Sequence, residues 1–433
     1  MSSTTTRPGL RVPPTPGAGA RSEGTAFGEG GALRRAFPLL GRLESPVTSY
    51  YVLLGVTCAL VVIGLVMVLS ASMITSYKDD GSSFAIFLKQ LGFAGVGLVG
   101  AVVASRLPVP WWRRLAIPAL AAAMGLQALV FTSLGVTVGG NRNWVRLGPF
   151  SLQPSELTKI GLVLVGALVF ANKRRALGLL RHVLFPYVLP VAAATVGLVL
   201  LGHDLGTALV LLGIIGAVLF AAGVPTRLFV LAGAGAAAIA VALTVTSANR
   251  MDRITNWMSG SCTDPDGVCG QSVHGLYALA DGGWWGVGLG ASKEKWAWLA
   301  EAHNDFIFAI IGEELGLPGT LVILALFTML ACACYRLVLR SEDQFVRVAT
   351  AGVMTWVLMQ AMINIGAVIG LLPVIGVPLP LVSAGGSALV TTMVAMGMLL
   401  AFARHEPGAK AILDARPSVV RRSLAVLPSR RNS

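Results

Sequence analysis

The sequence predicts an all-α polytopic membrane protein with ten transmembrane helices and a large extracytoplasmic loop between the seventh and the eighth. Three observations lead to this fold class. Hydrophobic residues make up 55% of the 433 residues and charged residues only 12%, about half the charged share of a soluble domain. Ten stretches are apolar over about 20 residues, the length that crosses a bilayer as a helix. Basic residues collect in alternate connections between these stretches.

The ten predicted spans form one membrane domain over residues 50–403. The tails 1–49 and 404–433 are rich in Pro, Gly, Ser and Ala and lack helical periodicity, which is typical of disordered segments. These tails carry eight of the thirteen net positive charges, so the charge indicates membrane flanks rather than a nucleic-acid surface. We expect no cleaved signal peptide in the first tail. The predicted spans are 50–74, 84–105, 115–136, 154–172, 184–201, 205–224, 228–248, 304–335, 346–372 and 381–403.

The distribution of basic residues predicts the orientation of these spans. With both termini in the cytoplasm, 24 of the 33 Lys and Arg residues lie on the inner side, and the outer connections hold seven. Cytoplasmic connections of membrane proteins carry such an excess of Lys and Arg. We therefore expect a multi-pass protein of the cytoplasmic membrane with both termini inside the cell.

The segment 249–303 is predicted to be the large extracytoplasmic loop. It holds five of the nine Trp residues together with acids and bases. A loop of this length is rarely a passive connector, although an interfacial aromatic belt is an alternative reading. Cys262 and Cys269 lie on the side of the membrane where disulfides persist, so they are either a bonded pair or two free thiols. No Cys and His spacing in the chain is typical of a zinc site.

A first polar cluster precedes and begins the fourth span. Arg142 and Arg146 lie in a Gly- and Asn-rich stretch, and Pro154 is well placed in the first turn of a helix. Glu156 and Lys159 are three residues apart and share one face of that helix. The pair is either an internal ion pair or, with the two Arg residues, part of a site for a diphosphate head group.

A second polar cluster lies at the outer mouth of the eighth span. Glu301, His303 and Asp305 precede a long apolar run, and Glu313 follows about 12 Å deeper along a continuous helix. A partly buried carboxylate at the mouth of a cavity is suited to act as a general base. The alternative for Asp305 is a helix-start acid that pairs with a basic neighbour.

Two smaller signals are Asp204, between the fifth and sixth spans, and the Pro- and Gly-rich stretch 378–387, which contains Ser383. Irregular backbone at membrane depth is tolerated only against protein or a water-filled cavity. No Gly-rich phosphate loop or nucleotide fingerprint occurs in the sequence, so a nucleotide substrate is unsupported.

Five motifs together resemble the SEDS family of polytopic peptidoglycan polymerases. They are GGNRNWVRLGPFSLQPSELTK, GHDLGTA, ADGGWWGVGLG, EAHNDFIFAIIGEELG and PLPLVSAGGS, spread over the whole membrane region. The fourth motif, EAHNDFIFAIIGEELG, resembles that of the cell-division member of the family more than that of the elongation member. The chain departs from the family where Ala300 replaces a common Pro, which leaves the local loop geometry in question.

The resemblance implies a peptidoglycan glycosyltransferase that polymerises lipid II at the outer face of the membrane during septal cell-wall synthesis. It places the essential acid at Asp305, which would deprotonate the 4-hydroxyl of the acceptor sugar. That hydroxyl would then displace undecaprenyl diphosphate from a second lipid-linked disaccharide. The other implied substrate-binding residues are Arg142, Arg146, Glu156, Lys159, Glu301, His303 and Ser383.

The resemblance also implies partners and a location. A class B penicillin-binding protein, other division proteins and membrane lipid are the expected partners at the division septum, and no nucleic acid is expected. No cofactor is expected with certainty; a divalent cation, Mg²⁺ or Mn²⁺, could bridge Asp305 and the diphosphate, but the sequence shows no dedicated metal site. Two alternatives stay open at this point: a lipid II flippase, and a non-catalytic division scaffold.

Overall fold

The computed structural model describes residues 45 and 47–415, apart from residues 139, 149, 174–179, 246–250, 252–253, 256, 259–267 and 297. Helices dominate this part of the chain, and they are α3 (Thr48–Asp80), α4 (Ala85–Arg106), α5 (Val109–Leu129), α6 (Pro154–Asn172), α7 (Leu180–Val183), the π-helix η2 (Leu184–Ala193), α8 (Ala194–Leu201), α9 (Leu205–Ala222), α10 (Thr226–Val245), α12 (Val268–Gly282), α13 (Ile307–Arg340), α14 (Gln344–Val368), α15 (Gly386–Arg404) and α16 (Ala409–Ala415).

Seven of the described helices are long and apolar enough to cross a membrane: α3, α4, α6, α9, α13, α14 and α15. The other three predicted spans coincide with α5, with η2 followed by α8, and with α10. The helix α5 carries Arg113 and Arg114 in its first turns, which lowers its apolar character. In the fifth predicted span Pro186 and Pro190 lie within the π-helical stretch, where each removes a backbone donor from the ordinary α-helical ladder.

Polar and glycine residues fix the ends of the helices as the sequence leads one to expect. The side chain of Asp204 accepts a hydrogen bond from Thr207 N at the start of α9, and Asp343 caps α14 in the same way. Gly81 and Gly223 end α3 and α9 in the left-handed conformation that glycine adopts at little cost. The long helix α13 has a kink at Gly316, two residues before Pro318.

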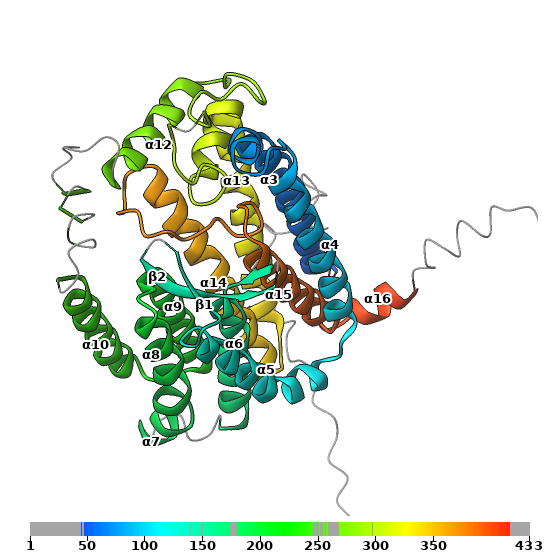
Figure 1. Cartoon of the computed structure of the whole chain (residues 1–433). Coiled ribbons are helices and arrows are strands. Elements are labelled where there is room, and N and C mark those ends of the chain that lie inside the picture. Colours follow the sequence, from blue (N-terminus) through cyan, green and yellow to red (C-terminus); the bar gives the residue numbers. More distant parts are fainter. Residues whose placement is uncertain are drawn as a thin grey trace, which may run out of the picture. The chain divides into compact units, whose positions relative to one another are not determined.

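The prediction of an all-α fold is wrong in one region. Residues 135–152 form a three-stranded antiparallel sheet, with β1 (Gly135–Val138) beside β2 (Asn141–Leu147) and β2 beside β3 (Phe150–Leu152). The third predicted span, 115–136, was therefore placed too far along the chain, because α5 begins at Val109 and ends at Leu129. The Arg142 N–H donates to the Gly202 carbonyl oxygen over 2.9 Å, which ties β2 to the end of α8. Figure 1 shows the strands lying above α6, α8 and α9.

Several further boundaries differ from the prediction: α3 runs on to Asp80 and α13 to Arg340, past the predicted ends at 74 and 335. The tenth span begins at Gly386 rather than at residue 381, because the preceding stretch is irregular. The segment 249–303 contains a helix, α12, which packs against α13 (Figure 1). Cys262 lies outside the described residues, so its pairing with Cys269 stays a prediction. The predicted tails 1–49 and 404–433 also lie mostly outside the described residues, although Thr48 already belongs to α3 and a short α16 follows α15.

Candidate functional site

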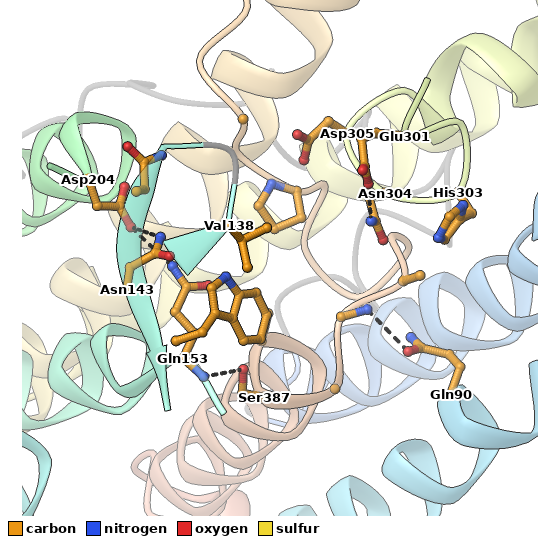
Figure 2. A pocket seen from close by; sticks show the side chains of 18 of the residues that line it. Gln90, Val138, Asn143, Gln153, Asp204, Glu301, His303, Asn304, Asp305 and Ser387 are labelled. Carbon is orange, nitrogen blue, oxygen red and sulfur yellow. Dashed lines mark hydrogen bonds between the residues drawn. The ribbon is translucent and has the colours of Figure 1, made fainter. Parts of the chain in front are cut away.

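A polar cavity of about 510 Å³ lies where several separate parts of the chain meet. Its lining comes from the start of α4, from β1 and β2, from Gln153 before α6, from Asp204 before α9, from Gln271 in α12, from the segment 301–305, and from residues 374–388, which end in the first turn of α15. Figure 2 shows Asp305, Glu301 and His303 on one side of the cavity, and Asp204, Asn143 and Gln153 on the other. We call this space the polar cavity.

The backbone around Asp305 is held in place by its neighbours. Asn364 Nδ2 donates to the Asp305 carbonyl oxygen over 2.7 Å, and Ser383 Oγ donates to the Asn304 carbonyl oxygen over 2.7 Å. The Ala384 N–H donates to the His303 carbonyl oxygen over 2.9 Å. The segment before α13 is therefore fixed to α14 and to the segment before α15, while the partly exposed Asp305 side chain lines the cavity.

His303 and Glu301 lie beside Asp305 and differ in environment. Glu301 is exposed and has a φ of 56°, a conformation that costs energy for a residue other than glycine. Its carboxylate accepts a hydrogen bond from Asn304 Nδ2. Burial lowers the pKa of His303 below its usual value, against a smaller opposing effect of Glu301 and Asp79. His303 is therefore neutral at neutral pH and can both donate and accept hydrogen bonds.

Asp204 organises the opposite wall of the polar cavity. One of its carboxylate oxygens accepts from Asn143 Nδ2 at 2.8 Å and from Gln153 Nε2 at 3.1 Å. The same carboxylate caps α9 through the Thr207 N–H at 2.9 Å. One buried acid thus joins the sheet, the start of α6 and the start of α9, so the side chains of Asn143 and Gln153 have fixed positions in the lining.

The two predicted arginines do not line the polar cavity. Arg142 donates from Nε to the Val130 carbonyl oxygen at 2.9 Å and from a terminal nitrogen to the Thr132 carbonyl oxygen at 2.8 Å. Its guanidinium therefore closes the turn between α5 and β1. Arg146 is exposed on β2. The side chains of Asn141, Asn143 and Trp144 line the cavity from this strand.

Glu156 and Lys159 form a buried ion pair inside the helix bundle. Lys159 Nζ lies 2.7 Å from Glu156 Oε1 and donates to Gln360 Oε1 at 3.2 Å. The side chains are 3% and 1% exposed, and the ammonium also lies 5.4 Å from the ring centre of Trp356. Both residues lie outside the lining of the polar cavity. The internal ion pair that the spacing offered as one alternative is present in the structure.

Two lining residues, Lys89 and Gln90, were not recognised as site candidates from the sequence. Lys89 is the one Lys or Arg residue in the described lining of the polar cavity, and it pairs with Asp80 at 3.1 Å. Gln90 Nε2 donates to the Ser383 carbonyl oxygen at 3.3 Å, and Gln90 Oε1 accepts from the Gly385 N–H at 3.1 Å. The sequence feature that could have indicated them is that Lys89 and Gln90 are adjacent polar residues near the start of an apolar span. Ser383 itself supports the cavity wall without lining it.

A second buried network joins the outer segment to α13. Lys295 Nζ lies 3.0 Å from Glu314 Oε1, with side chains 4% and 0% exposed, and Ser70 Oγ donates to the same carboxylate at 2.7 Å. Glu313 accepts from Ser292 Oγ at 2.5 Å and from the Lys293 N–H at 2.7 Å. Both acids of α13 therefore receive their hydrogen bonds from the outer segment and from α3.

Whether the site could hold a divalent cation depends on how many carboxylates lie close together around Asp305. Within the described part of the chain, no three residues among His, Cys, Asp and Glu gather closely enough to hold a metal ion. A cation at Asp305 would have that carboxylate as its protein ligand, with the remaining ligands from phosphate and water. Mg²⁺ is commonly held in this way, by one or two carboxylates and substrate phosphates.

Comparison with known proteins gives consistent matches over the membrane region. Residues 51–407 match a family described as "Cell cycle protein" and designated FTSW_RODA_SPOVE. The chain is 41% identical over 374 residues to a probable peptidoglycan glycosyltransferase FtsW of Mycobacterium tuberculosis, covering 86% of this chain and 71% of the relative. It is 35% identical over 352 residues to stage V sporulation protein E of Bacillus subtilis, covering 81% and 95%.

Two solved structures share the arrangement of helices. A structure described as showing the coordination of polymerization and crosslinking by a peptidoglycan synthase complex matches with a TM-score of 0.65 and 28% identity, covering 82% of this chain and 98% of that one. The rod shape determining protein RodA of Thermus thermophilus matches with a TM-score of 0.59 and 28% identity, covering 82% and 96%.

Proposed function

The chain belongs to the FTSW_RODA_SPOVE family of cell cycle proteins, and we propose that the polar cavity around Asp305 is where it carries out its chemistry. The chain is a multi-pass membrane protein and a peptidoglycan glycosyltransferase of septal cell-wall synthesis, as the resemblance of its motifs predicted. The observation that supports the site is the position of Asp305, partly exposed in a polar cavity of about 510 Å³. This volume is within the usual range of small-molecule sites.

In the proposed reaction, the Asp305 carboxylate removes the proton from the 4-hydroxyl of an acceptor sugar on lipid II. The resulting alkoxide attacks the anomeric carbon of a second lipid-linked glycan. A new glycosidic bond forms, the bond to the diphosphate breaks, and undecaprenyl diphosphate leaves with the bonding electron pair. General base catalysis of this kind contributes about 10²- to 10⁴-fold to a rate.

The leaving diphosphate needs positive charge or hydrogen-bond donors. Lys89 lines the cavity and its pair with Asp80 is exposed, so its charge can be shared with a phosphate. Arg146, exposed on the neighbouring strand, is a second candidate. The neutral imidazole of His303 and the carboxylate of Glu301 are suited to bind sugar hydroxyls. Arg142, Glu156, Lys159 and Ser383 would then act by holding the walls of the site, and a divalent cation at Asp305 would supply further charge to the diphosphate.

The proposed topology has ten spans, with both termini in the cytoplasm and the segment 249–303 outside. The ten helical stretches and the asymmetry of the basic residues support it. A class B penicillin-binding protein is the proposed partner at the septum, because one matched structure is a peptidoglycan synthase complex that couples polymerization to crosslinking.

The test measures glycan chains formed from lipid II by the purified protein with its partner in liposomes. We expect Asp305→Asn to lower the initial rate by at least about a hundredfold while it still folds and copurifies with the partner. The matched control is Asp281→Asn, since Asp281 lies on the neighbouring α12 in an exposed pair with Lys293. The control is expected to polymerise at the wild-type rate. Equal polymerisation by all three proteins would show that Asp305 is not the base.

A further inference from the structure

A second cavity lies at the other end of the two helices that carry part of the polar cavity. Its volume is about 250 Å³, and Arg106, Arg404 and Lys410 line it together with Ser105 and Pro108. Arg106 ends α4, Arg404 ends α15, and Lys410 lies in the short helix α16. The helices α4 and α15 pack along their lengths (Figure 1). We call this space the basic cavity.

Among the described residues, the three cations of the basic cavity have no acidic partner. The carboxylate of the nearby Glu406 is buried and is paired with Arg340 at 3.3 Å. Three positive charges around one cavity repel one another unless an anion lies between them. The geometry therefore favours a negatively charged ligand.

The surface beside the basic cavity indicates what kind of anion would bind. Val99, Val103 and Arg106 follow one another at helical spacing on α4, and the two valines are 65% and 55% exposed. Exposed valines on a membrane-spanning helix face acyl chains. An apolar strip thus leads directly to a cluster of cations at the end of the span, which matches the form of an anionic phospholipid.

We propose that the basic cavity binds the phosphate of an anionic phospholipid, with the acyl chains along the exposed valines of α4. Arginine forks and a lysine ammonium are the groups that recognise phosphate most often in proteins. The proposed orientation puts this end of the bundle at the cytoplasmic leaflet, where anionic lipids attract basic segments. The proposal rests on that orientation but not on the assignment of Asp305.

The bound lipid would bridge two helices whose opposite ends form the polar cavity. Gln90 near the start of α4 bonds the segment before α15, and Ser387 in the first turn of α15 accepts a hydrogen bond from the Gln153 N–H. A phosphate held by both Arg106 and Arg404 would keep the far ends of the same helices together.

The test measures lipid retention by native mass spectrometry of the purified protein in mixed micelles of phosphatidylglycerol and phosphatidylcholine. The test variant is Arg106→Gln/Arg404→Gln/Lys410→Gln. The control variant, Arg114→Gln/Lys173→Gln/Arg227→Gln, removes three cations from the same end of the bundle but outside the basic cavity. Thermal unfolding and lipid II polymerisation of each variant are recorded separately, so a loss of lipid is not confused with a loss of fold or of activity.

We expect wild type and the control variant to retain phosphatidylglycerol in preference to phosphatidylcholine. In the test variant, the ratio of retained phosphatidylglycerol to phosphatidylcholine should fall by at least about tenfold. The reason is that each basic residue near an anionic surface adds several-fold to the affinity. Each single substitution should lose part of it, which keeps the proposal testable if the triple variant unfolds. Equal retention by the test and control variants would refute the proposal. Displacement of the lipid by about 10 mM inorganic phosphate would also overturn it, because the site would then recognise free phosphate and not a lipid.

Discussion

The buried pair of Glu156 and Lys159 allows a quantitative prediction. In Lys159→Met, the Glu156 carboxylate would lose the ammonium that lies 2.7 Å away, in a place where its side chain is only 3% exposed. The second oxygen of this carboxylate, Oε2, has no hydrogen-bond partner in the structure. Leaving a buried charge without its partner costs about 3–5 kcal/mol. We expect Lys159→Met to lose about this much free energy of unfolding.

The double variant Glu156→Gln/Lys159→Met should recover most of that loss, because neither buried charge remains. Replacement of a buried ion pair by neutral side chains of similar volume is often neutral or stabilising. The exposed pair of Lys293 and Asp281 is the control, with a distance of 3.4 Å and side chains 75% and 46% exposed. Lys293→Met should change the stability by less than about 1 kcal/mol.

The assay is thermal unfolding of the detergent-solubilised protein, followed for wild type, Lys159→Met, the double variant and the control Lys293→Met. The reasoning fails if Lys159→Met unfolds at the wild-type temperature, or if the double variant is less stable than Lys159→Met alone. If the double variant is stable, its rate of lipid II polymerisation then shows whether the pair serves the structure alone or also substrate binding. Full activity would make the pair structural, and lost activity in a folded protein would place the Lys159 charge in substrate binding.

Three further perturbations test other parts of the structure by thermal unfolding. Gly64→Ala should lower the free energy of unfolding by about 1–3 kcal/mol, because a Cβ atom there would lie 2.7 Å from the backbone of the segment before α15. The control Gly55→Ala should leave the stability unchanged, because its Cβ atom would meet no atom within 4 Å. Asp204→Ala should cost about 1–3 kcal/mol, since it leaves the donors of the sheet and of α9 unpaired; unchanged unfolding would contradict the role of this acid. Burial lowers the pKa of His303, so the folded protein favours the neutral imidazole. The stability that depends on this neutral form is fully present above pH 6.5, the ordinary pKa, and is lost as the pH falls through the lowered pKa. His303→Gln should therefore flatten this acid-side loss, and an unchanged pH profile would argue against it.

The helical spans were predictable from the sequence because the bilayer imposes their length and composition. Each of the ten predicted stretches coincides with helical residues in the structure. The errors lie at the ends, where tertiary contacts decide the backbone. Hydropathy extended the tenth span back to residue 381, but Gln90 and Ser383 hold the residues before Gly386 in an irregular path. The contacts of Gln90 join positions about 290 residues apart and leave no local pattern.

The candidate site was predictable where its residues are neighbours in sequence, as Glu301, His303 and Asp305 are. It was less predictable where a side chain had several available partners. The spacing of Arg142 did not indicate whether its guanidinium would meet a diphosphate or the carbonyl oxygens of the turn before β1, which it contacts in the structure. Lys89 lies within the predicted span 84–105, and only the fold shows that it lines the polar cavity.

The acids of α13 explain how the outer segment and the proposed base depend on each other. Charged groups at membrane depth are costly unless they are paired, and Glu313 and Glu314 receive their partners from the segment around Lys295. The same helix begins two residues after Asp305. A displacement of the outer segment would therefore leave Glu313 without its donors and Glu314 with Ser70 of α3 alone. It would also disturb the start of the helix next to the proposed base. A partner that stabilises the outer segment would, by the same contacts, stabilise the position of Asp305.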